Sequence, residues 1–181
     1  MLPTRNIGLS APETGSFPPL EELNQLSVAA FADAMAKLFE PAPRFAARLA
    51  TERPFPSDNV LLEAAARIAR AMPEADQVEL INAHPRIGAT ATDLSEHSRR
   101  EIGSAQPEAD KELADLNAAY EARFGFRYLV HVAGRRRSEL IPGFRSALHR
   151  KRNAELRRAV QDTLAIAAER LQRLRSTEDE T

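Results

Sequence analysis

Residues 107–132, PEADKELADLNAAYEARFGFRYLVHV, change their hydrophobic periodicity at Gly125. Before this glycine, apolar and aromatic residues recur at steps of three and four, which places them on one face of a helix. After it, FRYLVHV alternates Phe126, Tyr128, Val130 and Val132 with the residues between them, which is the period of two that is typical of extended chain. A single extended segment has no strand to pair with. The stretch therefore predicts a long helix that ends at the glycine, followed by a short extended segment outside any sheet. The residues of the helical stripe are Leu113, Leu116, Tyr120 and Phe124.

Helical spacing of apolar residues also dominates the chain on both sides of this stretch. It predicts a helix that ends near Pro41 and another that Ser57 caps and Pro73 stops. It also predicts a short helix before His84 and a long last helix that begins at Asn153. These elements favour an all-α fold, a single-domain multi-helix bundle with one short extended segment after Gly125.

The length of 181 residues suits one globular domain. Residues 1–19 are rich in Pro, Gly and Ser and lack the long apolar run of a signal peptide or membrane span, so they are expected to form a flexible lead-in. Residues 176–181 are expected to fray as an acidic tail, which leaves 20–175 as a single all-α catalytic domain. Within it, Pro142 and Gly143 are expected to delay the start of the helix around Phe144.

Composition argues against several classes of partner. The chain has 25 Lys and Arg against 26 Asp and Glu, so its net charge of -1 gives no general attraction to nucleic acid or to an anionic membrane. The basic residues within 135–152 are interpreted as a solvated, salt-bridged face. No cysteine is present, which excludes a disulfide framework and a thiolate nucleophile. We therefore expect a soluble, cytoplasmic protein that binds neither nucleic acid nor membrane.

His84 stands directly before Pro85 in NAHPRIGA, residues 82–89. A residue that precedes proline is pushed out of the α region, so the helix is expected to end here and to expose the imidazole at its exit. An imidazole with an ordinary pKa of about 6.5 can give or take a proton near neutral pH. His84 is therefore a candidate acid–base group, and the alternative is a histidine that only hydrogen-bonds a helix terminus.

Ser98 and Glu101, in SRRE, lie three residues apart and would share one helical face. A hydroxyl and a carboxylate beside an imidazole could bind a polar substrate and orient the proton carrier. The alternative is an exposed acid one turn from a serine. A further alternative takes Asp93, His97 and Glu101 as metal ligands, with His84 as a fourth, although a straight helix spreads the first three over two turns.

Several short motifs in a fixed order resemble one enzyme family. They are ELNQLS, ERPF, AHPRIG, SRRE, LNAAYEARFGFRYLV, a GR turn and a final RL at Arg170 and Leu171, and they span most of residues 20–175. In this combination the chain resembles the 2-oxo-4-hydroxy-4-carboxy-5-ureidoimidazoline (OHCU) decarboxylases of urate breakdown. The resemblance implies an all-helical, cofactor-free enzyme without a metal, usually a homodimer, that removes CO2 from the small-molecule ureidoimidazoline and yields (S)-allantoin.

The resemblance also implies roles for individual residues. His84 would act in proton transfer with Glu101 beside it, and Arg170 would face the anionic substrate. Ile102 occupies a substrate-binding position where the family usually has a glutamine, which gives some support to a non-catalytic α-helical binding module of the same fold. A hydrolase that uses the metal ligands named above is the third hypothesis. The remaining implied substrate contacts are Pro85, Ser98, Tyr128, Leu129, Val130, His131 and Val132.

Overall fold

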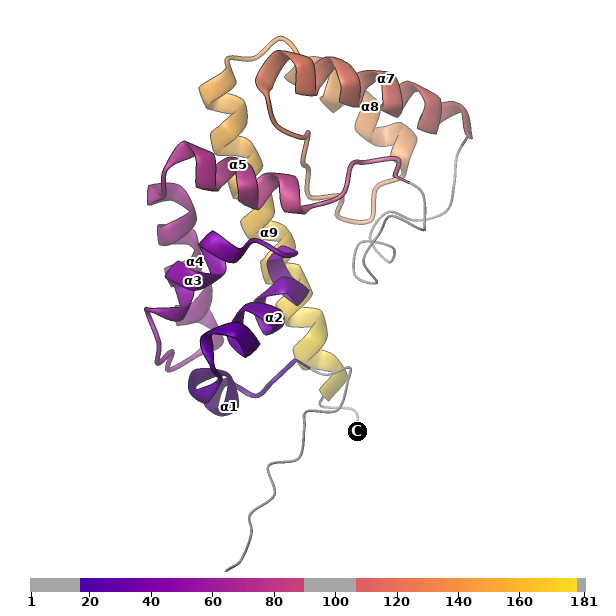
Figure 1. Ribbon diagram of the computed structural model, residues 1–181. Coiled ribbons are helices and arrows are strands. Elements are labelled where there is room, and N and C mark those ends of the chain that lie inside the picture. Colours follow the sequence, from indigo (N-terminus) through magenta and orange to yellow (C-terminus); the bar gives the residue numbers. More distant parts are fainter. Residues whose placement is uncertain (1–16, 90–106, 179–181) are drawn as a thin grey trace, which may run out of the picture.

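The computed structural model describes residues 17–89 and 107–178, and within these two ranges it contains eight α-helices and no strand (Figure 1). The all-α class predicted from the sequence is confirmed. The helices are α1 (Leu20–Gln25), α2 (Val28–Phe39), α3 (Pro43–Ala50), α4 (Asp58–Ala71), α5 (Glu74–Ala83), α7 (Pro107–Phe124), α8 (Arg137–Ala147) and α9 (Arg152–Glu178).

Helix α9 is the central element of the bundle. Helices α2, α4 and α5 pack against it, and Figure 1 shows α7 and α8 lying together at the end where α9 begins. The face of α9 that meets these helices carries apolar residues three and four positions apart, as the sequence predicted. Burying each of the larger ones contributes roughly 1.5–3 kcal/mol. The buried apolar residues of α9 are Leu156, Ala159, Val160, Leu164, Ile166, Ala167 and Leu171.

Local chemistry accounts for the helix boundaries. The Ser57 side chain accepts a hydrogen bond from the Val60 N–H at 3.3 Å, which caps α4 as predicted. Helix α5 ends at Ala83, and His84 adopts an extended conformation (φ -75°, ψ 145°) before its proline. Gly125 follows α7 with φ 77°, a left-handed conformation that costs a glycine little. The predicted ends of these three helices are therefore confirmed.

The prediction that Pro142 and Gly143 delay the start of a helix is wrong. Helix α8 begins at Arg137 and continues through both residues to Ala147. The Glu139 carboxylate accepts the Arg136 N–H at 2.7 Å and so stabilises the first turn. Leu140, Ile141, Phe144 and Ala147 are buried, and this packing offsets the backbone hydrogen bond that proline cannot make.

The packed part of the chain extends beyond the predicted domain bounds of 20 and 175. Phe17 is fully buried, with the Arg175 guanidinium 4.9 Å from the centre of its ring. At the other end, α9 continues to Glu178. In the two described ranges, no helix combines the length and the apolar character that crossing a bilayer requires.

The segment after Gly125 runs without regular secondary structure, and arginine side chains bind its backbone. The Arg158 Nη1 donates to the Leu129 carbonyl at 2.7 Å, and the Arg135 Nη2 donates to the His131 carbonyl at 2.6 Å. A segment outside any sheet has to satisfy its carbonyls in another way, and these guanidinium groups do so. The two guanidinium groups therefore fix the path of this segment where it runs beside α9.

A buried carboxylate, Glu155, connects the arginine that binds this segment to helix α7. It is fully buried and accepts hydrogen bonds from the Tyr120 hydroxyl at 2.8 Å, the Arg158 Nε at 3.0 Å and the Arg150 Nη1 at 3.1 Å. Burial opposes the charged form, but these donors outweigh it and hold the pKa of Glu155 below its usual value. Burial and the bond to Glu155 raise the pKa of Tyr120, which keeps this hydroxyl a neutral donor.

The lowered pKa of Glu155 predicts a pH-dependent contribution to stability. Because the carboxyl binds its proton more weakly in the folded state, its contribution is present above its usual pKa of 4.5 and is lost as the pH falls below that value. Between about pH 5 and pH 3, the free energy of unfolding should fall more steeply for the wild type than for Glu155→Gln, because only the wild type has this carboxylate to protonate. Urea unfolding at a series of pH values measures this difference, with Glu63→Gln on the exposed face of α4 as the control. Parallel curves for the wild type and Glu155→Gln would contradict it.

Candidate active site

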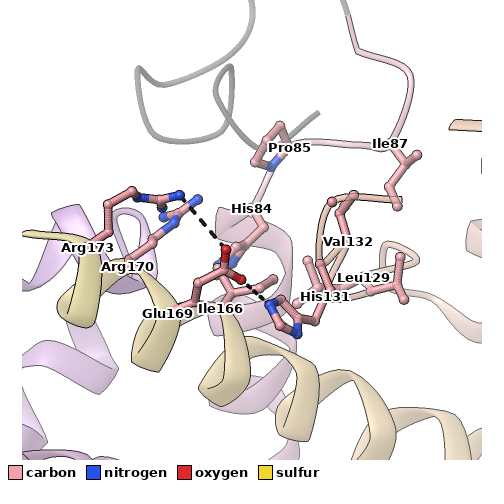
Figure 2. Close-up of a pocket in the computed structure, with 13 residues that line it drawn as sticks. His84, Pro85, Ile87, Leu129, His131, Val132, Ile166, Glu169, Arg170 and Arg173 are labelled. Carbon is pink, nitrogen blue, oxygen red and sulfur yellow. Dashed lines mark hydrogen bonds and ion pairs between the residues drawn. The ribbon is translucent and has the colours of Figure 1, made fainter. Parts of the chain in front are cut away.

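A cavity of about 160 Å³ lies where the loop after α5, the extended segment and the C-terminal half of α9 meet (Figure 2). Its walls combine apolar side chains with two histidines, one acid and two arginines, which is the mixture expected of a site for a small polar molecule. The lining residues are His84, Pro85, Ile87, Leu129, Val130, His131, Val132, Ala133, Gly134, Ile166, Glu169, Arg170 and Arg173.

His84 is held at this cavity by its neighbours in the chain and by Arg127. Its side chain is buried, and its Nδ1 lies 3.3 Å from the Leu80 carbonyl oxygen, one turn back in α5. A carbonyl only accepts hydrogen bonds, so Nδ1 carries the proton, and Nε2 is the nitrogen through which a proton can be exchanged. The Arg127 Nη1 donates to the carbonyls of Asn82 at 2.6 Å and His84 at 2.8 Å, which fixes the backbone at the helix exit.

Arg170 comes from α9 and is almost completely buried. Its Nη2 lies 3.0 Å from the Glu40 Oε1, and its Nη1 donates to the Leu38 carbonyl at 3.4 Å. Glu40 follows α2 with φ 58°, a left-handed conformation that costs a residue with a side chain about 1 kcal/mol or more. The pair therefore brings a paired cation to the cavity wall and ties the end of α2 to α9.

Glu169 lies between His131 and Arg173 in Figure 2. The His131 Nε2 is in close contact with the Glu169 Oε2, and the Arg173 Nη1 lies 4.0 Å from the Glu169 Oε1. His131 belongs to the extended segment, whereas Glu169 and Arg173 are one turn apart on α9. The contact thus joins two walls of the cavity with ionisable groups.

The structure brings together many of the site residues predicted from the sequence. His84 and Pro85 line the cavity with Arg170, and the four residues Leu129, Val130, His131 and Val132 form its opposite wall. The prediction that Tyr128 also lines it is wrong, because its buried ring stacks on Phe144 at 3.7 Å between centres. Ser98, Glu101 and Ile102 lie outside the described residues, as do Asp93 and His97.

Two charged groups of the cavity lining, Glu169 and Arg173, were not predicted from the sequence, and neither was Glu40, the partner of Arg170. The spacing of Arg173 from Arg170 and Glu169 on one helix was a usable signal, because residues three and four apart share a face. Glu40 gives no such signal, since it is 130 residues away from Arg170 in the chain. Among the residues of the two described ranges, no group of three histidine or acidic side chains could hold a metal ion.

Comparison with known proteins identifies the family. The profile of the OHCU decarboxylases matches residues 24–172, which include every described cavity residue except Arg173. The chain belongs to the OHCU decarboxylase family. A 2-oxo-4-hydroxy-4-carboxy-5-ureidoimidazoline decarboxylase of Halalkalicoccus jeotgali is 29% identical over 90% of this chain and 94% of its own length. The corresponding protein of Haloferax volcanii is 28% identical over 84% of this chain and 93% of its own length.

Other members of the family are longer or are known as solved structures. A uric acid degradation bifunctional protein of Bacillus subtilis is 29% identical over 90% of this chain, and the match spans 34% of that protein. An OHCU decarboxylase crystallised in the presence of (S)-allantoin superposes with a TM-score of 0.68 and 23% identity, over 80% of this chain and 98% of the other. This structural match establishes that the fold is shared.

Proposed function

We propose that this protein decarboxylates OHCU to (S)-allantoin in urate breakdown, with His84 as the proton donor. The observation that carries the proposal is the position of His84. Its tautomer is set by Leu80, and it faces a small cavity that also presents Arg170 and Arg173. A substrate that is an anion and has to receive one proton needs this combination of cations and an acid–base group.

The chemistry makes modest demands on the protein. When CO2 leaves, the electron pair of the broken bond stays on the ring carbon that carried the carboxylate, and the adjoining C=N system of the ring can accept it. The protein has to bind the carboxylate, hold the bond to it out of the plane of the ring, and deliver one proton to one face of the adjoining ring carbon, which bears the ureido group and becomes the stereocentre of allantoin. Arg170 and Arg173 of α9 attract the carboxylate, and the imidazolium form of His84 supplies the proton from Nε2.

Delivery of the proton from one side explains a single enantiomer of the product. His84 is buried, and both its ring nitrogen and its backbone carbonyl are held by neighbouring groups. A fixed donor reaches only the face of the ring that the cavity turns toward it. We assign Glu101 and Ser98 to the same reaction, as the group beside His84 and as a substrate contact, and Ile102 to a contact with the substrate.

Two further features are proposed with this function. The family resemblance implies a homodimer, which sedimentation equilibrium of the purified protein measures. A cytoplasmic location is proposed as well, and cell fractionation with an antibody to the protein tests it.

Turnover of OHCU is the direct experiment. OHCU is generated from urate by urate oxidase and hydroxyisourate hydrolase, the purified protein is added, and circular dichroism follows the allantoin formed. We expect rapid formation of the (S) enantiomer, at a rate that increases with protein concentration. The same mixture without the protein gives the spontaneous baseline. Racemic product at the baseline rate would contradict the proposal and favour the non-catalytic binding module.

A further inference from the structure

The contact between His131 and Glu169 places a carboxylate inside a cavity that otherwise attracts anions. Of the described residues that line the cavity, Glu169 is the one acid, and it lies next to Arg170 in the chain. Its Oε2 contacts the His131 Nε2, which orients the carboxylate from the opposite wall (Figure 2). The reaction proposed above gives this acid no role.

The second oxygen of Glu169 has room for a donor from a ligand. The Arg173 Nη1 is 4.0 Å from the Glu169 Oε1, which is too far for a hydrogen bond. No other donor in the described part of the chain reaches this oxygen within hydrogen-bond distance. The Glu169 side chain is 45% exposed, so a molecule that enters the cavity can approach it.

The charged groups of the cavity favour different positions for the carboxylate and the ureido group of the substrate. Arg170 and Arg173 attract a carboxylate, whereas Glu169 repels it and accepts hydrogen bonds only from donors. The donor-rich arm of OHCU is its ureido group, which carries three N–H bonds. We propose that Glu169, oriented by His131, binds the ureido arm of the substrate and so sets the direction in which the ring lies. This inference rests on the proposed decarboxylase function.

A purely structural role is the competing explanation, because the same contact ties the extended segment to α9. The structural role and the ureido-binding role predict different results for the variant Glu169→Gln. Glu169→Gln keeps the shape of the side chain and an oxygen that His131 can donate to, so a structural tie survives. It loses the negative charge, which weakens hydrogen bonds to the ureido group.

Binding of the product separates the roles. (S)-Allantoin retains the ureido arm but lacks the carboxylate of the substrate, and hydantoin is the same ring without the ureido arm. Isothermal titration of both compounds is compared for the wild type, Glu169→Gln and the control Glu52→Gln, whose carboxylate pairs with Arg67 on the surface. We expect Glu169→Gln to bind (S)-allantoin about tenfold more weakly and hydantoin equally well. With OHCU, its KM should rise by a similar factor while kcat changes by less than about twofold.

The outcomes are distinct for the two proposals. Unchanged (S)-allantoin affinity in Glu169→Gln, or a lowered melting temperature with unchanged affinity, overturns the ureido site. Equal weakening of hydantoin and allantoin also overturns it, because the contact would then be to the ring. If Glu169→Gln selectively loses allantoin affinity while the wild type fails to convert OHCU, the ureido site is supported and the decarboxylase proposal fails.

Discussion

Replacement of His84 by asparagine is expected to lower kcat for OHCU about 10³-fold, because the proton donor is removed while its surroundings are kept. The asparagine Nδ2 can take the place of the imidazole Nδ1 and donate to the Leu80 carbonyl, which now lies 3.3 Å from that nitrogen. The rest of the buried ring is lost, and the small cavity that remains should cost roughly 1 kcal/mol, a shift of a few degrees in Tm. The circular dichroism assay gives kcat, and thermal unfolding gives Tm.

His149→Asn is the matched control, since His149 is exposed after the end of α8 and is remote from the cavity lining. It should keep the wild-type kcat. Titration with (S)-allantoin shows whether His84→Asn still forms the site, and we expect its affinity to stay within about threefold of the wild type. A wild-type kcat in His84→Asn would mean that another group donates the proton. An unfolded His84→Asn protein would assign this histidine a structural role.

The features of the fold that could be predicted are helix ends that depend only on residues within one turn of each other in the sequence. Ser57 caps α4 with its own hydroxyl, and Gly125 ends α7 because it adopts a positive φ. Pro142 misled the prediction because the packing of α8 on α7 and the first-turn contact of Glu139 outweigh its local preference. Such packing depends on residues from two helices, so it cannot be inferred from the periodicity of one.

The same division holds for the candidate site. The helix exit at His84 follows from Pro85. Alternation along the extended segment did not predict the cavity wall, because Val130 and Val132 line the cavity together with Leu129 and His131, whereas Tyr128, in the same phase as the two valines, does not. The family resemblance led to Arg170, but the pairing of this arginine with Glu40 depends on how α2 meets α9. The position of His131 beside Glu169 likewise exists only in the folded chain, since 38 residues separate them. Pairing of charges across elements is the part that sequence alone could not provide.

Replacement of Arg170 by methionine should destabilise the protein by about 3–5 kcal/mol, because it leaves the buried Glu40 carboxylate without this guanidinium. The long apolar side chain of methionine fills most of the space that the arginine occupies. Urea unfolding measures the loss. Arg67→Met is the control, since Arg67 pairs with Glu52 on the surface and its removal should cost less than about 1 kcal/mol.

The double variant Glu40→Gln with Arg170→Met separates the stability of this pair from its function. Without either charge, most of the lost stability should return, because an apolar group and a neutral amide replace a buried ion pair at little net cost. If Arg170 also attracts the substrate carboxylate, the folded double variant should still show a KM for OHCU raised by about tenfold or more. A double variant as unstable as Arg170→Met would show that Glu40 is not the reason for the loss. A stable double variant with a wild-type KM would leave Arg170 as a tie between α2 and α9, with Arg173 as the remaining cation for the substrate.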